Sequence, residues 1–313
     1  MTMEAIHITD VAPRDGLQNQ PVHLGANDKL RLVQLLAAAG VRSVEATSFV
    51  SPKAVPQMAD AAELLPLVHA ALPELRCSVL VPNLKGLERA HAAGAAEIAV
   101  VLSATETMNQ RNINMGLEQA TEISERTLAA AQALGLRTRA YVAVAFDCPF
   151  EGETPLAEVL RLAQRMQAAG AGEIVIADTI GSASPGMVKE RMRVLAEAIA
   201  PERLAIHLHD TRGMAVANAW AALEAGIRRF DASVGGTGRE RAAAGNLATE
   251  DLVLMAERSG FATGISLDGL LEAIDFAQER LQRPLGGRAI AWLRRQREKT
   301  NSSNNTSPET ATT

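Results

Sequence analysis

The chain has 313 residues, of which 47% are hydrophobic, and a formal net charge of −5 at pH 7. This length is sufficient for one large core, and the negative charge excludes the basic surface that binding to nucleic acid requires. The two cysteines, Cys77 and Cys148, have no redox or zinc-binding spacing, which favours a reducing cytoplasm over a disulfide-stabilised exterior. With no apolar run of membrane length and no signal sequence, we expect a cytoplasmic protein without a membrane partner.

Short apolar strands alternate with Ala- and Leu-rich helices along the chain. The first strand, Ile6–Val11, leads into a loop, and a helix over 27–40 follows, with Asn27 as its candidate cap. The second strand is Val41–Ser48. Further strands are predicted near 75–81, 97–102, 137–145, 173–178, 203–208 and 229–234, with helices near 57–70, 84–93, 117–134, 155–169, 186–199, 214–225 and 248–259. Five of these helices end in a glycine that favours a left-handed C-terminal position: Gly40, Gly94, Gly135, Gly170 and Gly226.

Eight strand-helix units predict a (β/α)8 TIM barrel, with a doubly wound open sheet as the alternative. We expect a catalytic barrel domain over 1–265 and a helical extension over 266–299, containing helices Leu267–Leu281 and Ala289–Glu298. The extension is expected to cap the barrel or to carry a contact in a homodimer or higher homo-oligomer. Residues 300–313 are rich in Asn, Ser and Thr, so we expect a disordered tail.

Polar residues follow the predicted strands, at the end of a barrel where chemistry takes place. His207 and His209 face one side of their strand, where imidazoles are common ligands for divalent cations; two core histidines that only hydrogen-bond are the alternative. Asp15 and Asn246 offer oxygen ligands, and Arg14 offers stabilisation of an oxyanion. A surface Arg-Asp pair and a helix-capping Asn are the alternatives here. Such a ligand set suits Mg²⁺ or Mn²⁺, and Zn²⁺ next.

The motifs around these residues resemble those of the 3-hydroxy-3-methylglutaryl-CoA (HMG-CoA) lyase family, which belongs to a superfamily of metal-dependent TIM-barrel lyases and synthases. The motifs that carry the resemblance are Pro13-Arg14-Asp15-Gly16-Leu17-Gln18-Asn19, Glu45 to Lys53 with Val55 to Asp60, Pro82 to Gly86, Asn112-Ile113-Asn114, Cys148 to Gly152, Asp178 to Gly181, His207 to Thr211 and Gly245 to Asp251.

The resemblance implies cleavage of a 3-hydroxyacyl-CoA, with HMG-CoA as the leading substrate, into acetyl-CoA and a keto acid such as acetoacetate, as in leucine catabolism. By position in the motifs, it implies that Asp15, His207, His209 and Asn246 bind the metal and that Arg14, Asp15, Glu45 and His207 are catalytic. Arg14 is expected to stabilise the enolate of acetyl-CoA, with Glu45 beside it. The positions expected to contact substrate are Gln18, Ser48, Asp178, Thr179, Arg239 and Glu250.

The chain departs from the family in one segment. Members carry a catalytic cysteine in a Gly-Gly-Cys-Pro-Tyr-Ala context, whereas this chain has Gly235-Gly236-Thr237-Gly238-Arg239-Glu240-Arg241-Ala242-Ala243-Ala244. This run is similar to the Gly-Glu-Arg-x-Gly-Asn motif of isopropylmalate and homocitrate synthases, so Arg239, Glu240 or Arg241 is a candidate for contact with substrate. Three alternatives therefore stand beside an HMG-CoA lyase: a citramalyl-CoA-type lyase, a Claisen-type synthase, and a barrel that binds metal and acyl-CoA without catalysis.

Overall fold

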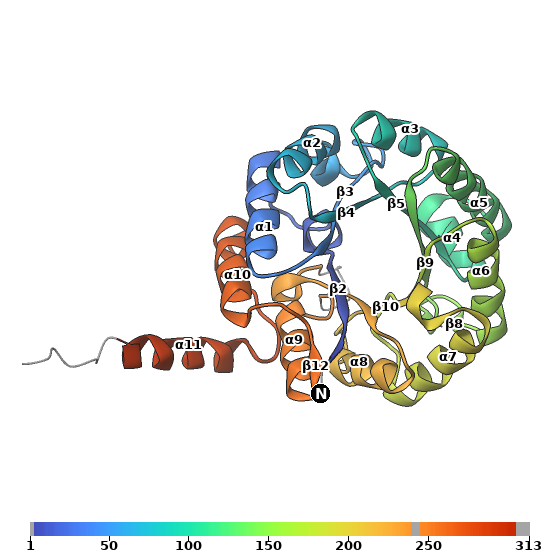
Figure 1. The fold of residues 1–313 in the computed structure, drawn as a ribbon. Coiled ribbons are helices and arrows are strands. Elements are labelled where there is room, and N and C mark those ends of the chain that lie inside the picture. The colour runs from blue at the N-terminus through green and yellow to red at the C-terminus, as the bar shows by residue number, and fades with distance from the viewer. Residues whose placement is uncertain (1–2, 239–244, 305–313) are drawn as a thin grey trace, which may run out of the picture.

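The protein is a closed barrel of parallel strands, seen end-on in Figure 1, in a computed structural model that describes residues 3–238 and 245–304. The sheet closes because the last barrel strand pairs in parallel with the first, at Phe230 and Ile8 among other positions. The predicted (β/α)8 barrel is therefore confirmed, and the open-sheet alternative is wrong. The eight strands, in order around the barrel, are β2 (His7–Asp10), β3 (Ser43–Ser48), β4 (Arg76–Leu80), β5 (Glu97–Ser103), β6 (Arg137–Ala143), β9 (Glu173–Asp178), β10 (Leu204–Leu208) and β11 (Arg229–Ala232).

Helices surround the strands, and α10 fills the space between the first and the last helix of the ring by packing on both α1 and α9. Its buried side chains include Leu270 and Ile274, so this part of the predicted extension belongs to the ring. The helices are α1 (Ala26–Ala38), α2 (Ala61–Ala71), α3 (Leu84–Ala92), α4 (Glu106–Ile113), α5 (Leu117–Ala133), α6 (Leu156–Ala168), α7 (Pro185–Ala198), α8 (Ala215–Glu224), α9 (Thr249–Arg258), α10 (Leu267–Leu281) and α11 (Ile290–Asn304).

The glycines predicted to close helices have the expected backbone conformation. Gly40 follows α1 with φ +101°, and a Cβ at this position would lie 2.3 Å from the backbone oxygen of Gly264, so space as well as conformation requires glycine. Left-handed conformations also occur at Gly94, Gly135, Gly170 and Gly226. The sequence thus marks these five returns from helix to strand correctly.

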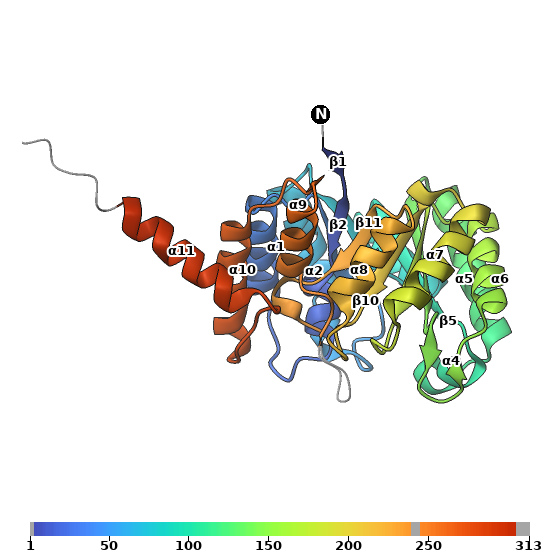
Figure 2. The ribbon, with the colours of Figure 1, turned by 90° about the horizontal axis from the view of Figure 1, so that it is seen from below.

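Several boundaries differ from the prediction, among them the start of α1 and the end of α11. Helix α1 begins at Ala26 with Gly25 at the N-cap, so Asn27 lies inside the first turn and does not cap the helix. Helix α11 continues to Asn304, so residues 300–304 are helical where the sequence predicts a disordered tail, and 305–313 lie outside the described residues. Helix α11 points away from the barrel, as Figures 1 and 2 show.

Several short elements were not predicted. The turn η1 (Ala12–Gly16) follows β2 as a single helical turn, and the hairpin of β7 (Asp147–Cys148) and β8 (Gly152–Glu153) follows β6. Near the N-terminus, β1 (Glu4–Ala5) pairs with β12 (Phe261–Ala262) at the end of the barrel opposite the loops that follow the strands (Figure 2). The short turns η2 (Pro56–Met58), η3 (Pro201–Arg203) and η4 (Val234–Gly236) complete the elements.

Apolar side chains fill the layer between the strands and the surrounding helices, whereas the interior of the barrel holds charged residues. Arg139 is 1% exposed, and Glu45 and Glu97 are fully buried. None of the helices among the described residues is both long and apolar enough to cross a membrane.

Candidate active site

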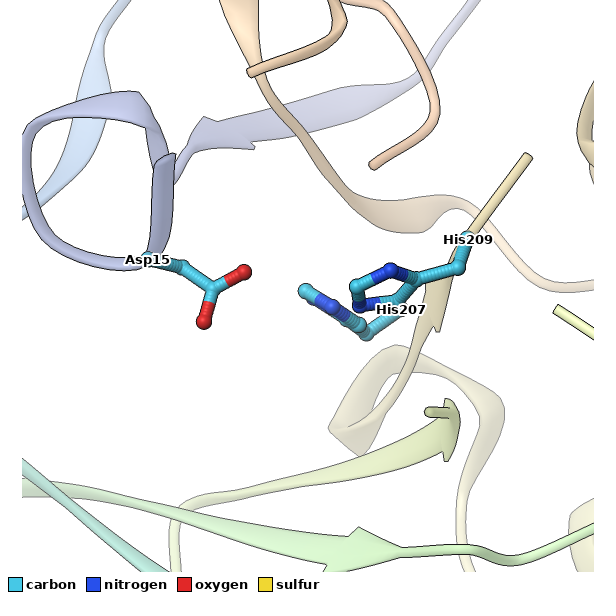
Figure 3. Close-up of side chains that lie close together, drawn as sticks. All are labelled: Asp15, His207 and His209. Atoms are coloured by element: carbon cyan, nitrogen blue, oxygen red, sulfur yellow. The ribbon is translucent and has the colours of Figure 1, made fainter. Parts of the chain in front are cut away.

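Three predicted metal ligands meet at the carboxyl end of the barrel. Asp15 comes from η1, His207 from β10, and His209 from the segment just after β10; one ligand atom from each lies within 4.8 Å of the other two. Figure 3 shows the carboxylate of Asp15 facing the two imidazoles. Gly16 lets η1 lie close to Thr237, in the segment that follows β11. A Cβ at position 16 would lie 2.3 Å from Thr237 Oγ1 and would clash with it. The Arg-Asp-Gly sequence therefore has a packing reason as well as a chemical one.

Asn246 lies beside this group and is the fourth predicted ligand. Its Nδ2 donates to Asp15 Oδ2 at 2.7 Å and to the backbone oxygen of Thr237 at 3.0 Å. Its Oδ1 is buried and has no hydrogen-bond partner among the described residues. Helix α9 has Ala248 at its N-cap, so Asn246 does not cap it. An unsatisfied buried oxygen next to a carboxylate and two imidazoles fits a divalent cation, because hard cations take such oxygen donors.

Charges around Asp15 keep it ionised. Burial opposes ionisation, but Arg14, His207 and His209 outweigh it and lower the pKa of Asp15 to about 2. A metal ligand must be deprotonated, so the site holds this carboxylate in the form that binds a cation.

Arg14 is 7% exposed and is held in place by carboxylates on two elements. Its Nε and Nη2 donate to Glu45 Oε2 at 2.9 and 2.6 Å, and its Nη1 donates to Asp15 Oδ1 at 2.6 Å. Burial raises the pKa of Glu45, and Arg14 only partly offsets this effect. A surface Arg-Asp pair, the alternative considered for the sequence, is excluded by this burial.

A second set of residues supports His207 and was not predicted. Asp231 Oδ2 lies 3.4 Å from His207 Nδ1 and accepts a hydrogen bond from the Tyr141 hydroxyl at 2.7 Å, while Arg139 Nη2 donates to Asp231 Oδ1 at 2.7 Å. Asp231 raises the pKa of His207 against the opposing effect of burial. The sequence carries a signal for this set, because Arg139, Tyr141 and Asp231 are polar residues in the middle of predicted strands.

The residues predicted to contact substrate differ in their surroundings. Ser48 ends β3 and is fully buried with its hydroxyl unpartnered among the described residues, while Gln18 is partly exposed next to η1. Asp178 accepts from the backbone amides of Ser182 and Ala183 at 2.9 and 3.1 Å, so its carboxylate orders the turn after β9.

Two further predicted residues bind backbone, and one cannot be placed. Thr179 accepts from the amide of Val144 at 2.8 Å, and Glu250 accepts from the amides of Gly235 and Gly287 at 3.0 and 2.7 Å. Burial raises the pKa of Glu250 to about 7. Arg239, like Glu240 and Arg241, lies outside the described residues.

Thr237 follows Gly235 and Gly236 at the place where the family motif has cysteine. It is 1% exposed, its hydroxyl forms a 2.5 Å hydrogen bond with Ser233, and its backbone oxygen accepts from Asn246. The threonine therefore helps to fix the position of Asn246 but carries no thiol for acid-base or redox chemistry.

Comparison with known proteins places the chain in a family. The HMGL-like family model matches residues 5–276. The mitochondrial hydroxymethylglutaryl-CoA lyase of Macaca fascicularis is 42% identical over 281 residues, which cover 89% of this chain and 86% of the relative.

Two solved structures share the fold. The HMG-CoA lyase of Bacillus subtilis matches with a TM-score of 0.90 at 36% identity and covers 94% of this chain and 100% of its own. An HMG-CoA lyase from Acinetobacter baumannii, in complex with coenzyme A and 3-methylmalate, matches with a TM-score of 0.88 at 36% identity and covers 93% of this chain and 96% of its own. The chain belongs to the HMGL-like family of carbon-carbon lyases.

Proposed function

We propose that the chain is a metal-dependent HMG-CoA lyase that releases acetyl-CoA and acetoacetate. The observation that carries the proposal is the convergence of Asp15, His207 and His209 at the carboxyl end of the barrel, with the unsatisfied oxygen of Asn246 beside them. Relatives named as HMG-CoA lyases, at about 40% identity over most of the chain, support HMG-CoA as the substrate.

Asp15, His207, His209 and Asn246 are the residues that would hold the cation. A divalent cation in this position supplies Lewis-acid chemistry, which lowers the pKa of an alcohol. Their hard oxygen and neutral nitrogen donors favour Mg²⁺ or Mn²⁺, with Zn²⁺ as the next candidate.

Arg14 is the residue that receives the developing negative charge. The 3-hydroxyl of the substrate loses its proton, the bond between C2 and C3 breaks, and C3 becomes the ketone carbon of acetoacetate. The electron pair of that bond passes to the thioester as an enolate, which takes up a proton at C2 to give acetyl-CoA. The guanidinium of Arg14, fixed by Glu45, stabilises the enolate oxygen through charge-assisted hydrogen bonds.

A substrate panel tests the proposal. Purified protein is incubated with Mg²⁺ or Mn²⁺ and HMG-CoA, citramalyl-CoA or other 3-hydroxyacyl-CoA thioesters, and acetyl-CoA release is measured beside Mn²⁺ binding by electron paramagnetic resonance. We expect release from HMG-CoA and binding of Mn²⁺. Release from citramalyl-CoA alone would move the substrate to that class. Free CoA formed from acetyl-CoA and a 2-keto acid would indicate a synthase, and Mn²⁺ binding without any turnover would indicate a binding protein.

The proposal also covers the substrate class, the cellular location and the oligomeric state of the protein. The acyl-CoA substrate is supported by the coenzyme A complex of the Acinetobacter baumannii relative. We also propose that the enzyme is cytoplasmic. We further propose that it forms a homodimer or higher homo-oligomer, and sedimentation of the purified chain tests this oligomeric state.

A further inference from the structure

The Tyr141 side chain lies across the interior of the barrel beneath the candidate metal ligands. It projects from β6, is 4% exposed, and packs against Ala99, Val175 and Ala205 on three other strands of the barrel. A phenylalanine at this position would fill the same space with its ring. The hydroxyl group therefore calls for a separate explanation.

The Tyr141 hydroxyl stands between two carboxylates that serve different parts of the site. It donates to Asp231 Oδ2 at 2.7 Å, lies 3.5 Å from Glu45 Oε2, and accepts from Arg139 Nη1 at 3.1 Å. The hydroxyl has one proton, which points chiefly to Asp231 Oδ2 at the shorter distance, while Glu45 Oε2 lies at the outer limit of hydrogen-bond distance from the same donor.

Each carboxylate leads to a different part of the site. Glu45 holds Arg14, which donates to Asp15, whereas Asp231 lies beside Nδ1 of His207. Asp15 and His207 each offer a ligand atom to the candidate metal site, so the contacts from Glu45 through Arg14 and Asp15 to His207 and Asp231 form a ring. The Tyr141 hydroxyl, between Asp231 and Glu45, closes this ring on the side facing the barrel interior.

We propose that Tyr141 is a positioning residue whose hydroxyl couples the Glu45–Arg14 pair to the Asp231–His207 pair. Through this coupling the guanidinium that receives negative charge and the imidazole that binds the cation keep a fixed separation. Groups that orient a metal ligand in this way typically contribute about 10- to 100-fold to metal affinity or activity. The inference rests on the proposed function, because it assigns a role within the same site.

Tyr141→Phe tests the coupling, since it removes the hydroxyl and keeps the ring. We expect kcat for HMG-CoA at saturating Mn²⁺ to fall about 10- to 100-fold, Mn²⁺ affinity to weaken about 10-fold, and KM to change little. Thr127→Val is the matched control, because it removes a buried hydroxyl that bonds only to the Ile123 backbone oxygen on α5. The control should lower thermal stability and leave both Mn²⁺ affinity and kcat unchanged.

Glu45→Gln provides a second test that keeps Tyr141. We expect it to weaken Mn²⁺ binding although Glu45 is outside the ligand set, and we expect the double variant with Tyr141→Phe to lose less than the product of the two single losses, since both break one ring. A Tyr141→Phe protein with wild-type kcat and Mn²⁺ affinity, or multiplicative losses in the double variant, would overturn the inference while leaving the lyase intact. A wild-type protein that neither binds Mn²⁺ nor releases acetyl-CoA would overturn the proposed function instead.

Discussion

The two ends of the barrel interior both bury charged side chains, but they satisfy those charges differently. At the amino end, Glu97 accepts from Arg76 at 2.6 and 2.7 Å and from Arg137 at 3.0 Å, and Glu173 accepts from Arg139 at 2.6 Å and Arg229 at 3.3 Å. Each carboxylate there accepts hydrogen bonds from guanidinium groups on two other strands of the barrel.

At the carboxyl end, the pairing is incomplete. Glu45 Oε1, Ser48 Oγ and Asn246 Oδ1 are buried without a hydrogen-bond partner among the described residues, and Asp15 and His207 face the same point. A buried polar atom without a partner costs free energy, so such atoms persist where a ligand completes them.

Cavity volume alone does not identify the candidate site. A cavity of about 660 Å³ opens at the amino end, lined by Arg76, Arg137, Arg229, Glu74, Glu173 and Glu202 among others. Its lining holds three Arg and three Glu side chains, and the carboxylate of Glu173 pairs with Arg76 and Arg229. The state of the charges, and not the volume, therefore marks the functional end.

Removal of a metal ligand should have the largest effect. Asp15→Ala and His207→Ala each remove one of the converging donors, so we expect loss of Mn²⁺ binding and a fall in activity of more than ~100-fold, beyond the effect of an orienting residue. Isothermal titration with Mn²⁺ and the acetyl-CoA assay measure both losses. If either variant binds Mn²⁺ as tightly as the wild type, the unsatisfied polar atoms at the carboxyl end do not mark a metal site.

Arg14→Ala should separate catalysis from metal binding. Loss of one group that stabilises an oxyanion typically lowers kcat by about 10²- to 10³-fold. We expect this loss with Mn²⁺ affinity weakened by no more than the roughly 10-fold expected for Tyr141→Phe, because Asp15 keeps its hydrogen bond from Asn246 and its position in η1. Mn²⁺ loss on Arg14→Ala would instead make Arg14 part of the metal site.

The sequence predicts the convergence of Asp15, His207 and His209 better than the residues around them. Asp15, His207 and Asn246 occur in local motifs at strand ends, and barrel closure brings strand ends together whatever the detailed packing. Tyr141 and Asp231 are 90 residues apart, and nothing local pairs them. Only the closed sheet shows that both side chains point inward and meet.

The missed secondary structure has a similar explanation. The β7–β8 hairpin has two residues in each strand, too few for a periodic pattern. Helix α11 extends into a polar segment whose composition favours disorder, so composition alone places its end too early.

Glu97→Gln should affect stability and not catalysis. Burial opposes ionisation of Glu97, but the hydrogen bonds from Arg76 outweigh it and lower its pKa, so the variant removes a charged acceptor. Hydrogen bonds to charged groups contribute about 1.5–3 kcal/mol each to the free energy of unfolding. Because the side chains of Arg76 and Arg137 are partly exposed and solvent screens their charges, we expect a total loss of about 1.5 kcal/mol. Urea denaturation measures the loss, and kcat and Mn²⁺ affinity should stay at wild-type values. A drop in kcat at full folding would give the amino end a functional role.

Asp10 offers a pH-dependent test near the carboxyl end. Burial raises its pKa from 3.8 to about 7 despite hydrogen bonds from Thr249, Ala12 and Val234. Between these values the folded chain keeps a proton that the unfolded chain loses. The stabilisation is therefore complete below pH ~4 and is lost as the pH rises through about 7, with a slope of at most about 1.4 kcal/mol per pH unit.

Asp10→Asn should remove this slope. We expect thermal melts to show the largest loss of stability of the variant, compared with the wild type, at about pH 5. This difference in stability should narrow toward about pH 8. Glu122→Gln, at an exposed position on α5, is the control and should show no such trend. A constant difference across the range would contradict the raised pKa of Asp10.

Thiol modification should have the smallest effect, because neither end of the barrel presents a reactive cysteine. Cys77 in β4 and Cys148 in β7 are each 3% exposed, and burial raises the pKa of Cys77 to about 12. The thiolate is the reactive form, so both thiols should resist a maleimide in the native protein and react in urea. We expect unchanged acetyl-CoA release after treatment of the native enzyme, with mass spectrometry reporting the modification. Inactivation that accompanies modification of either cysteine would assign to that thiol the role that Thr237 cannot fill.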